Sequence, residues 1–266
     1  MKPEKNARER MEKWDITSPE ASGFHEVIIP NREDCSVVNV FRLNLPAGET
    51  YQLKSGGLEM NAVLISGHSH IKNDFFNNDM EKYDSFYIPG STEISIKANE
   101  DSVFYIGGAE CEKTGKAFFR KFDKDLPLGG IHQIHGSGVG QREVYFTLNP
   151  EVPASRLICG LTWSRNGTWT SWPPHQHERD LEEVYCYCDM NAPKFGLHIS
   201  YLKSGEIEDM VVHTVRSGSM VLAPCGYHPT VASPGTCNTY FWILASFSHA
   251  SRRYDLAVTD PVYLGT

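Results

Sequence analysis

Residues 171–188 read SWPPHQHERDLEEVYCYC, and this stretch decides how the rest of the chain is interpreted. His175 and His177 stand one residue apart on a segment stiffened by two prolines. Because side chains alternate across an extended segment, both imidazoles should point to one face. Glu183 follows six residues after His177 and opens an apolar run. Imidazole and carboxylate ligands in this pattern indicate a site for a divalent transition metal.

A fourth ligand is expected from GSMVLAPCGYHPTVASPG at residues 218–235, where a Pro-x-Gly turn precedes His228. The carboxylate ligand has two candidates, Glu182 and Glu183, which point to opposite faces of the predicted strand. Strand parity with Tyr185 favours Glu183. The four predicted metal ligands are therefore His175, His177, Glu183 and His228.

Short strand-like runs continue in both directions from this stretch, each ended by Gly, Pro, Asn or Asp. Many short strands with regular turn signals predict an all-β sandwich or barrel. The runs are CSVVNVFRLNL (35–45), NAVLISG (61–67), DSFYIPG (84–90), TEISIKA (92–98), DSVFYIG (101–107), RLICGLTW (156–163), EVYCYC (183–188), GLHISYL (196–202), SMVLAPC (219–225) and NTYFWILASF (238–247).

The two halves of the chain share a spacing that indicates an internal duplication. Tyr51, Leu53 and Glu59 stand at the offsets of His175, His177 and Glu183, and the first half thus looks like a copy that has lost its histidines. This offset also favours Glu183 over Glu182. We expect an N-terminal arm or short helix (1–25), a first barrel without metal ligands (26–124), a glycine-rich linker (125–141) and a metal-binding second barrel (142–266).

These residues carry a resemblance to a known family. HQHERDLEEVYCYC (175–188) and PCGYHPTVASPG (224–235) resemble the two metal-binding motifs of the cupin superfamily, on a chain with two cupin barrels. Together with SWPPHQH (171–177) and PASRLICG (153–160), they most resemble the 5-deoxy-glucuronate isomerases of inositol catabolism, relatives of the 5-keto-4-deoxyuronate isomerases of pectin breakdown. The first half matches in outline, through ISG (65–67) and YIPGSTEISI (87–96).

The resemblance implies a bicupin, that is, two double-stranded β-helix (jelly-roll) barrels from a duplication. It also implies one divalent metal per chain in the second barrel (Zn, Mn, Fe, Ni or Co, with Zn slightly favoured), no organic cofactor, and an aldose-to-ketose conversion of 5-deoxy-glucuronate to 5-dehydro-2-deoxy-gluconate. The cysteine-bearing strand and the polar loop NDFFNNDMEKYD (73–84) depart from the family pattern, which leaves the exact substrate open. Two other functions stay open: a non-catalytic cupin that binds sugar acids, and an Fe(II) dioxygenase.

Candidates for the remaining roles are less sharply defined. Metal-bound hydroxide, Glu182 or a tyrosinate from Tyr185 or Tyr187 could move the substrate proton. A forked guanidinium could hold a substrate carboxylate, and the candidates are Arg142, Arg156 and Arg253. His68 and His70 form a second pair, but they lack a glutamate at suitable spacing and are expected on an exposed hairpin. His132 and His135, in the glycine-rich segment, are expected to have a structural or substrate-rim role.

Composition excludes several classes of protein. The 266 residues carry a net charge of −8 with no cluster of Lys and Arg, which disfavours nucleic-acid binding. No run of apolar residues is long enough for a membrane helix, and the N-terminus is charged, so a cytoplasmic location is expected. The expected partners are a small sugar acid and further copies of the chain, since exposed sheet edges commonly associate.

Overall fold

Antiparallel β-sheets account for most of the computed structural model, which describes residues 5–112, 114–205 and 208–265. Each of the predicted strand segments contains a strand, so the prediction of an all-β chain is confirmed. The one α-helix among these residues is α1 (Lys5–Met11), and short 3₁₀ turns are η1 (Gly138–Gly140), η2 (His249–Ser251), η3 (Tyr254–Leu256) and η4 (Pro261–Tyr263). None of the helices in the described ranges is long and apolar enough to cross a membrane.

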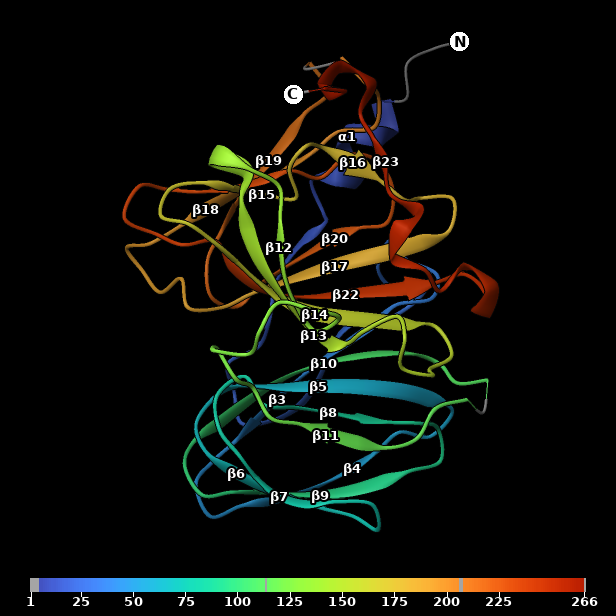
Figure 1. Ribbon diagram of the computed structural model, residues 1–266, viewed down its shortest axis with the longest axis vertical. Helices are drawn as coiled ribbons and strands as arrows, with labels where there is room; N and C mark the ends of the chain where they lie inside the picture. Colours follow the sequence, from blue (N-terminus) through green and yellow to red (C-terminus); the bar gives the residue numbers. More distant parts are fainter. Residues whose placement is uncertain (1–4, 113, 206–207, 266) are drawn as a thin grey trace.

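The first half of the molecule, the strands β2 to β11, forms two sheets in the lower part of Figure 1. The larger has the order β11 (Phe118–Arg120), β8 (Ser85–Ile88), β5 (Leu58–Ser66), β10 (Ser102–Glu110), β3 (Asn39–Leu45) and β2 (Gly23–Ile28). The smaller has the order β4 (Thr50–Lys54), β9 (Glu93–Ala98), β6 (Ser69–Lys72) and β7 (Asn77–Met80).

The second half, the strands β12 to β23, forms the upper part. Its large sheet has the order β1 (Asp15–Thr17), β20 (Ser219–Ala223), β17 (Leu181–Tyr187), β22 (Thr239–Ser246), β14 (Leu157–Ser164), β13 (Arg142–Leu148) and β12 (His132–His135). A smaller sheet contains β15 (Trp169–Thr170), β21 (Thr230–Ala232), β18 (Gly196–Ser200) and β19 (Val211–Val215). A two-stranded ribbon joins β16 (His175–Gln176) to β23 (Val258–Thr259).

Strand order repeats between the halves. The order β8-β5-β10-β3 in the first large sheet recurs as β20-β17-β22-β14 in the second, and β4-β9-β6-β7 recurs as β15-β21-β18-β19. Two segments expected outside the barrels belong to sheets: β1, from the N-terminal arm, pairs with β20, and β12, from the glycine-rich segment, pairs with β13. The linker expected at 125–141 is thus partly a sheet strand.

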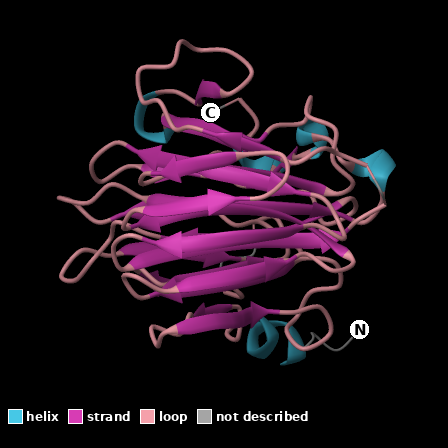
Figure 2. Cartoon of the chain, turned by 90° about the horizontal axis from the view of Figure 1, so that it is seen from below, coloured by secondary structure: helices cyan, strands magenta, loops and turns pink. Residues whose placement is uncertain are grey.

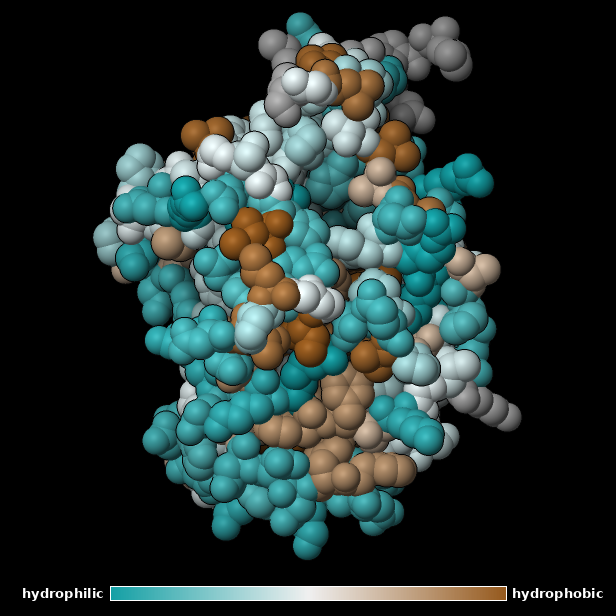
Figure 3. Space-filling model, viewed as in Figure 1, coloured by the Kyte–Doolittle hydropathy of each residue, from teal (hydrophilic) through white to brown (hydrophobic). Residues whose placement is uncertain are grey.

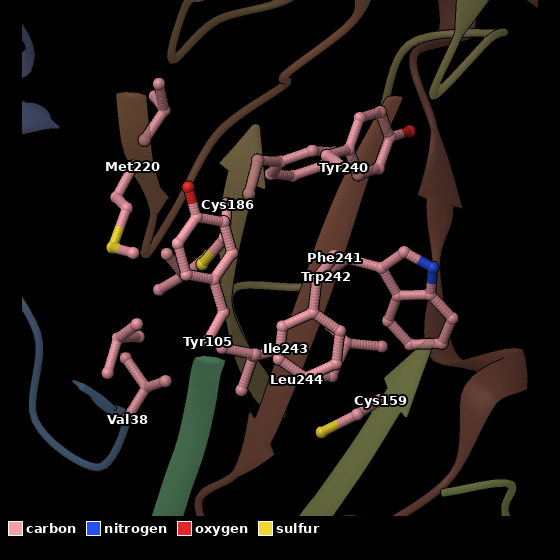
Figure 4. Close-up of a cluster of buried hydrophobic side chains, with 14 of the residues drawn as sticks. Val38, Tyr105, Cys159, Cys186, Met220, Tyr240, Phe241, Trp242, Ile243 and Leu244 are labelled. Carbon is pink, nitrogen blue, oxygen red and sulfur yellow. The ribbon is translucent and has the colours of Figure 1, made fainter. Parts of the chain in front are cut away.

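The two large sheets pack face to face, as the contacts of β10 with β14 and β22 establish, and Figure 2 looks onto the sheets, whose strands run side by side. Alternate residues of β10 face opposite ways: Phe104 and Ile106 join the core of the first half, whereas Tyr105 joins the core shared with the second. Figure 4 shows Tyr105 among Cys186, Met220 and Ile243. At Gly107 a Cβ atom would lie 2.8 Å from the Ile243 side chain, so the close approach of β10 to β22 requires glycine.

Two buried glutamates fasten the halves together in a reciprocal way, and we name these contacts the glutamate clasps. Glu59 of β5 accepts hydrogen bonds from the backbone amides of residues 155–157, each at 2.7 Å, and from the Tyr87 hydroxyl. Glu182 of β17 accepts from the backbone amides of residues 36–38, at 2.7–3.2 Å, and from the Ser36 hydroxyl. Each half therefore supplies one carboxylate to the residues at the start of a strand in the other half, β3 in one case and β14 in the other.

Candidate metal centre and substrate cavity

The four predicted ligands come from three segments of the second half. His175 lies on β16, His177 follows it, Glu183 lies on β17, and His228 precedes β21. The turn from His177 to β17 closes through the amides of Asp180 and Leu181, which both donate to the His177 carbonyl. Before His228 the chain turns at Gly226 with φ +73°, where a Cβ atom would lie 2.5 Å from the Tyr201 carbonyl oxygen. Only glycine fits this position.

These segments bring the four side chains into one cluster. One ligand atom from each of His175, His177, Glu183 and His228 lies within 4.8 Å of the others. Glu183 Oε2 is 2.9 Å from His177 Nε2 and 3.2 Å from His228 Nε2. Three of the four residues are buried and His175 is half-buried, which leaves the cluster approachable from one direction.

The second nitrogen of each imidazole fixes the orientation of its ring. Nδ1 of His175, His177 and His228 lies 3.0, 3.2 and 3.0 Å from the backbone carbonyls of Pro173, Leu181 and Gly226, respectively. A carbonyl only accepts, so each Nδ1 carries a proton, and in the neutral form of each ring Nε2 offers its lone pair to the cluster. His228 Nε2 is buried without a hydrogen-bond partner in the described chain, although Glu183 is near. Three neutral imidazoles and a carboxylate fit a divalent metal.

Electrostatics agrees with this donor set. Burial and the neighbouring His228 and His177 lower the pKa of His175 to about 3, so its imidazole is neutral. Burial alone would raise the pKa of Glu183, but the neighbouring His177 and His228 side chains outweigh it and hold that pKa well below its usual range. The cluster therefore holds an ionised Glu183 beside a neutral His175.

The two predicted tyrosines lie deeper than the cluster and have bonded hydroxyls. The Tyr185 hydroxyl is 3.1 Å from Glu183 Oε2 and 3.2 Å from Ser171 Oγ. The Tyr187 hydroxyl is 2.9 Å from both His198 Nδ1 and Thr230 Oγ1. Burial, and then the Glu183 charge, raise the pKa of Tyr185 well above its usual range, which disfavours a tyrosinate.

A cavity of about 220 Å³ opens beside the cluster. Arg142 Nη1 donates to the Trp172 carbonyl at 2.6 Å and to the Gly140 carbonyl at 3.3 Å, and no carboxylate of the described residues pairs with the guanidinium. The lining contains His135, Arg142, Trp172, Pro173, His175, His177, Leu181, Glu183, Leu244, Tyr254, Ala257 and Thr259. An unneutralised cation and a metal-ligand cluster thus share one small space.

The C-terminal segment closes part of this cavity. Its strand β23 is the sole sheet partner of β16 in the described chain, with His175 opposite Thr259. Asp260 anchors the segment: its buried carboxylate accepts hydrogen bonds from the Tyr201 and Ser204 hydroxyls, and its amide donates to the Pro174 carbonyl at 2.8 Å. A segment distant in sequence therefore holds the first ligand and contributes Tyr254 and Thr259 to the wall.

The remaining predicted residues lie elsewhere. Glu182 forms a clasp on the opposite face of β17 and does not line the cavity. Arg156 binds the Phe247 carbonyl and lies 2.8 Å from Glu112, and Arg253 is exposed and paired with Asp255 at 2.6 Å. His68 and His70 flank the start of β6, where His70 lies 2.7 Å from Asp79.

The structure also corrects the alignment between the halves. Counting offsets placed Glu59 opposite Glu183, but the clasps and the sheet register pair Glu59 with Glu182: Glu59 lies opposite Ala109 on β10, and Glu182 opposite Ala245 on β22. Met60, which is buried, therefore occupies the position of Glu183. The turn before β5 differs in length from the turn before β17, and counting along the chain cannot detect this difference.

This fold, with a three-histidine, one-glutamate cluster in one of two similarly ordered halves, defines a cupin-like protein. Oxalate decarboxylase from Bacillus subtilis superposes with a TM-score of 0.62 at 13% identity, over 92% of this chain and 79% of that one. The chain belongs to the KduI/IolB family, whose sequence profile matches residues 16–261.

Named relatives and a solved structure agree with that membership. The 5-deoxy-glucuronate isomerase of Halalkalibacterium halodurans is 28% identical over 243 residues, which cover 83% of this chain and 86% of that protein. The enzyme of the same name from Geobacillus kaustophilus is 26% identical over 219 residues, 76% of each chain. An IolB-like protein from Salmonella typhimurium superposes with a TM-score of 0.76 at 24% identity, over 87% of this chain and 92% of that one. The family is thus one of aldose–ketose isomerases.

Proposed function

We propose that this protein is a metal-dependent isomerase that converts the aldehyde 5-deoxy-glucuronate into the ketone 5-dehydro-2-deoxy-gluconate. The observation that carries the proposal is the cavity itself. It joins a cluster of three imidazoles and a carboxylate to an arginine that has no acidic partner among the described residues. A substrate with an aldehyde at one end and a carboxylate at the other matches both features.

His175, His177, Glu183 and His228 would hold the metal, which when bound supplies Lewis-acid stabilisation of negative charge on the sugar oxygens. Arg142 would bind the substrate carboxylate in a forked geometry, because its guanidinium faces the cavity without an ion pair in the described chain. The surrounding carbonyls of Trp172 and Gly140 orient this guanidinium. Tyr185 would steady Glu183 through its hydroxyl, and Tyr187 would support Tyr185 from beneath. Arg156, Arg253 and Glu182 have no part in this proposal.

The repeated strand order supports the proposal that the chain is a bicupin, with two double-stranded β-helix barrels from an internal duplication. We place the first barrel, without metal ligands, at 26–124 and the metal-binding barrel at 142–266. The clasps support the same interpretation, because Glu59 meets the backbone of the second half just as Glu182 meets the backbone of the first.

Self-association and a cytoplasmic location remain predictions. Support for association comes from β12, which is an edge strand of its sheet. Leu128, Ile134 and Val139, on and beside this strand, are exposed, and Figure 3 shows apolar surface on the face that carries β12.

The test combines metal analysis with NMR. Wild type should carry close to one divalent metal per chain, and the variant His175→Ala with His228→Ala should lose it. His68→Ala with His70→Ala, a matched pair outside the cluster, should keep it. In heavy water, wild type should replace the aldehyde signal of 5-deoxy-glucuronate by that of a ketone. Metal without turnover would refute the isomerase, and oxygen consumption would point to a dioxygenase instead.

A further inference from the structure

The isomerisation needs a hydrogen-bond donor that faces the substrate, and Tyr185 and Tyr187, the tyrosines singled out by the sequence, do not supply it. The hydroxyls of Tyr185 and Tyr187 are bonded to other side chains beneath the cluster, and neither residue lines the cavity. Tyr254, on η3 of the C-terminal segment, does line it. We propose that Tyr254 is a catalytic residue whose hydroxyl donates a hydrogen bond to the substrate oxygen on which negative charge develops. This inference rests on the proposed function.

The hydroxyl of Tyr254 is available for a ligand. It makes no hydrogen bond to any described residue, whereas the hydroxyls of Tyr185, Tyr187 and Tyr201 are all engaged. Because Tyr254 is half-buried on the cavity wall, its hydroxyl can hydrogen-bond to water or to a molecule that enters the cavity.

The position of Tyr254 suits a substrate that spans the cavity. The Glu183 charge raises the pKa of its phenol and the Arg142 charge lowers it. Tyr254 therefore lies within electrostatic reach of the histidine–glutamate cluster and of the guanidinium. Burial and the Glu183 charge raise the pKa of Tyr254 to about 12, so the phenol keeps its proton near neutral pH and acts as a donor.

The ring is held in place before a substrate arrives. Its centroid lies 5.1 Å from that of Phe146, 5.6 Å from Trp242 and 6.0 Å from His135, with edge-to-face packing against the first and last. A donor fixed in this way costs little reorganisation as the reaction proceeds, which is the condition for strong electrostatic stabilisation.

The step balances without a further reactant. A base removes the proton from the carbon next to the aldehyde, the C–H electron pair forms a C=C bond, and the carbonyl π electrons move to the oxygen. Tyr254 stabilises that oxygen by a hydrogen bond and keeps its own proton. The carbon-bound proton is then delivered to the former aldehyde carbon, and the hydroxyl proton transfers between the two oxygens.

Tyr254→Phe tests the proposal because it removes one oxygen and keeps the ring packing. Relative to wild type we expect kcat to fall about 100-fold with little change in KM, the loss typical of a missing oxyanion donor. Metal content and melting temperature should stay unchanged. Tyr51→Phe is the matched control, since Tyr51 is a tyrosine of the first half whose ring stacks on Phe24. A kcat within twofold of wild type would overturn the proposal.

A binding measurement separates this inference from the proposed function. Reduction of the aldehyde of 5-deoxy-glucuronate to an alcohol gives an aldonic acid that cannot isomerise. Calorimetry with this acid should show affinity weakened about fivefold in Tyr254→Phe relative to wild type. If wild type binds this acid but forms no ketone, the proposed reaction fails, and the contact by Tyr254 is judged on affinity alone. If wild type neither binds the acid nor forms ketone, both proposals fall.

Discussion

Replacing Glu182 by alanine should destabilise the protein strongly without emptying the metal site. The carboxylate is 2% exposed and accepts hydrogen bonds from three backbone amides and the Ser36 hydroxyl. Each buried donor left without an acceptor costs roughly 1–3 kcal/mol. Ser36 is exposed and can bind water instead, whereas Val38 is fully buried. The free energy of unfolding should therefore fall by about 3–5 kcal/mol.

Urea unfolding followed by tryptophan fluorescence measures this loss, with Glu59→Ala as the matched variant from the other clasp. Both variants should unfold at lower urea concentration and should bind metal at low temperature. The reasoning would be refuted if Glu182→Ala unfolded within about 1 kcal/mol of wild type. Loss of turnover with unchanged stability would instead assign Glu182 to proton transfer, the role that the sequence left open for it.

Three further predictions concern the cavity and its supports. Arg142→Gln should raise KM for 5-deoxy-glucuronate roughly 10- to 100-fold, because it removes a charged hydrogen-bond donor, while the metal content measured by mass spectrometry stays the same. Asp260→Ala should release β23 from β16 and weaken metal binding, measurable by competition with a chelator, although the residue is not a ligand. In the metal-free protein, the pKa of His175 is about 3 in the folded state and about 6.5 in the unfolded state. Between these pH values the unfolded chain binds more protons than the folded one. The free energy of unfolding therefore falls as the pH falls. Glu183, with its lowered pKa, acts in the same direction at lower pH. Urea unfolding of metal-free protein should lose about 2 kcal/mol between pH 7 and pH 5, and unchanged stability would contradict the assignment of a buried neutral His175.

The sequence predicted the features that are local. Strands are short and end at turn residues, so their existence follows from patterns within about ten positions. The grouping of His175, His177 and Glu183 also follows from local rules, since the two histidines share a face and Glu183 differs from Glu182 only in parity.

The features set by distant pairing could not be predicted. Tyr254 and Thr259 reach the cavity because β23, a strand of two residues, pairs with β16, and a strand this short has no periodicity to detect. Glu182 binds the backbone amides of residues 36–38. Because nearly every residue type has such an amide, the side chains at these positions give no sign of the contact. The alignment of Glu59 with Glu183 is wrong for a related reason, because loop lengths differ between the two halves while their sheet register agrees.

The clasps also govern which parts of this protein can be exchanged by recombination. The groups that meet each carboxylate are mainly main-chain amides at residues 36–38 and 155–157, and every residue except proline supplies such an amide. A chimera that joins the first half of one family member to the second half of another should therefore keep both glutamate clasps. This requires that the two glutamates and the lengths of the segments before β3 and β14 are retained. These clasps therefore tolerate side-chain changes around them, whereas the shared core at Gly107 and Ile243 must be exchanged as a matched pair.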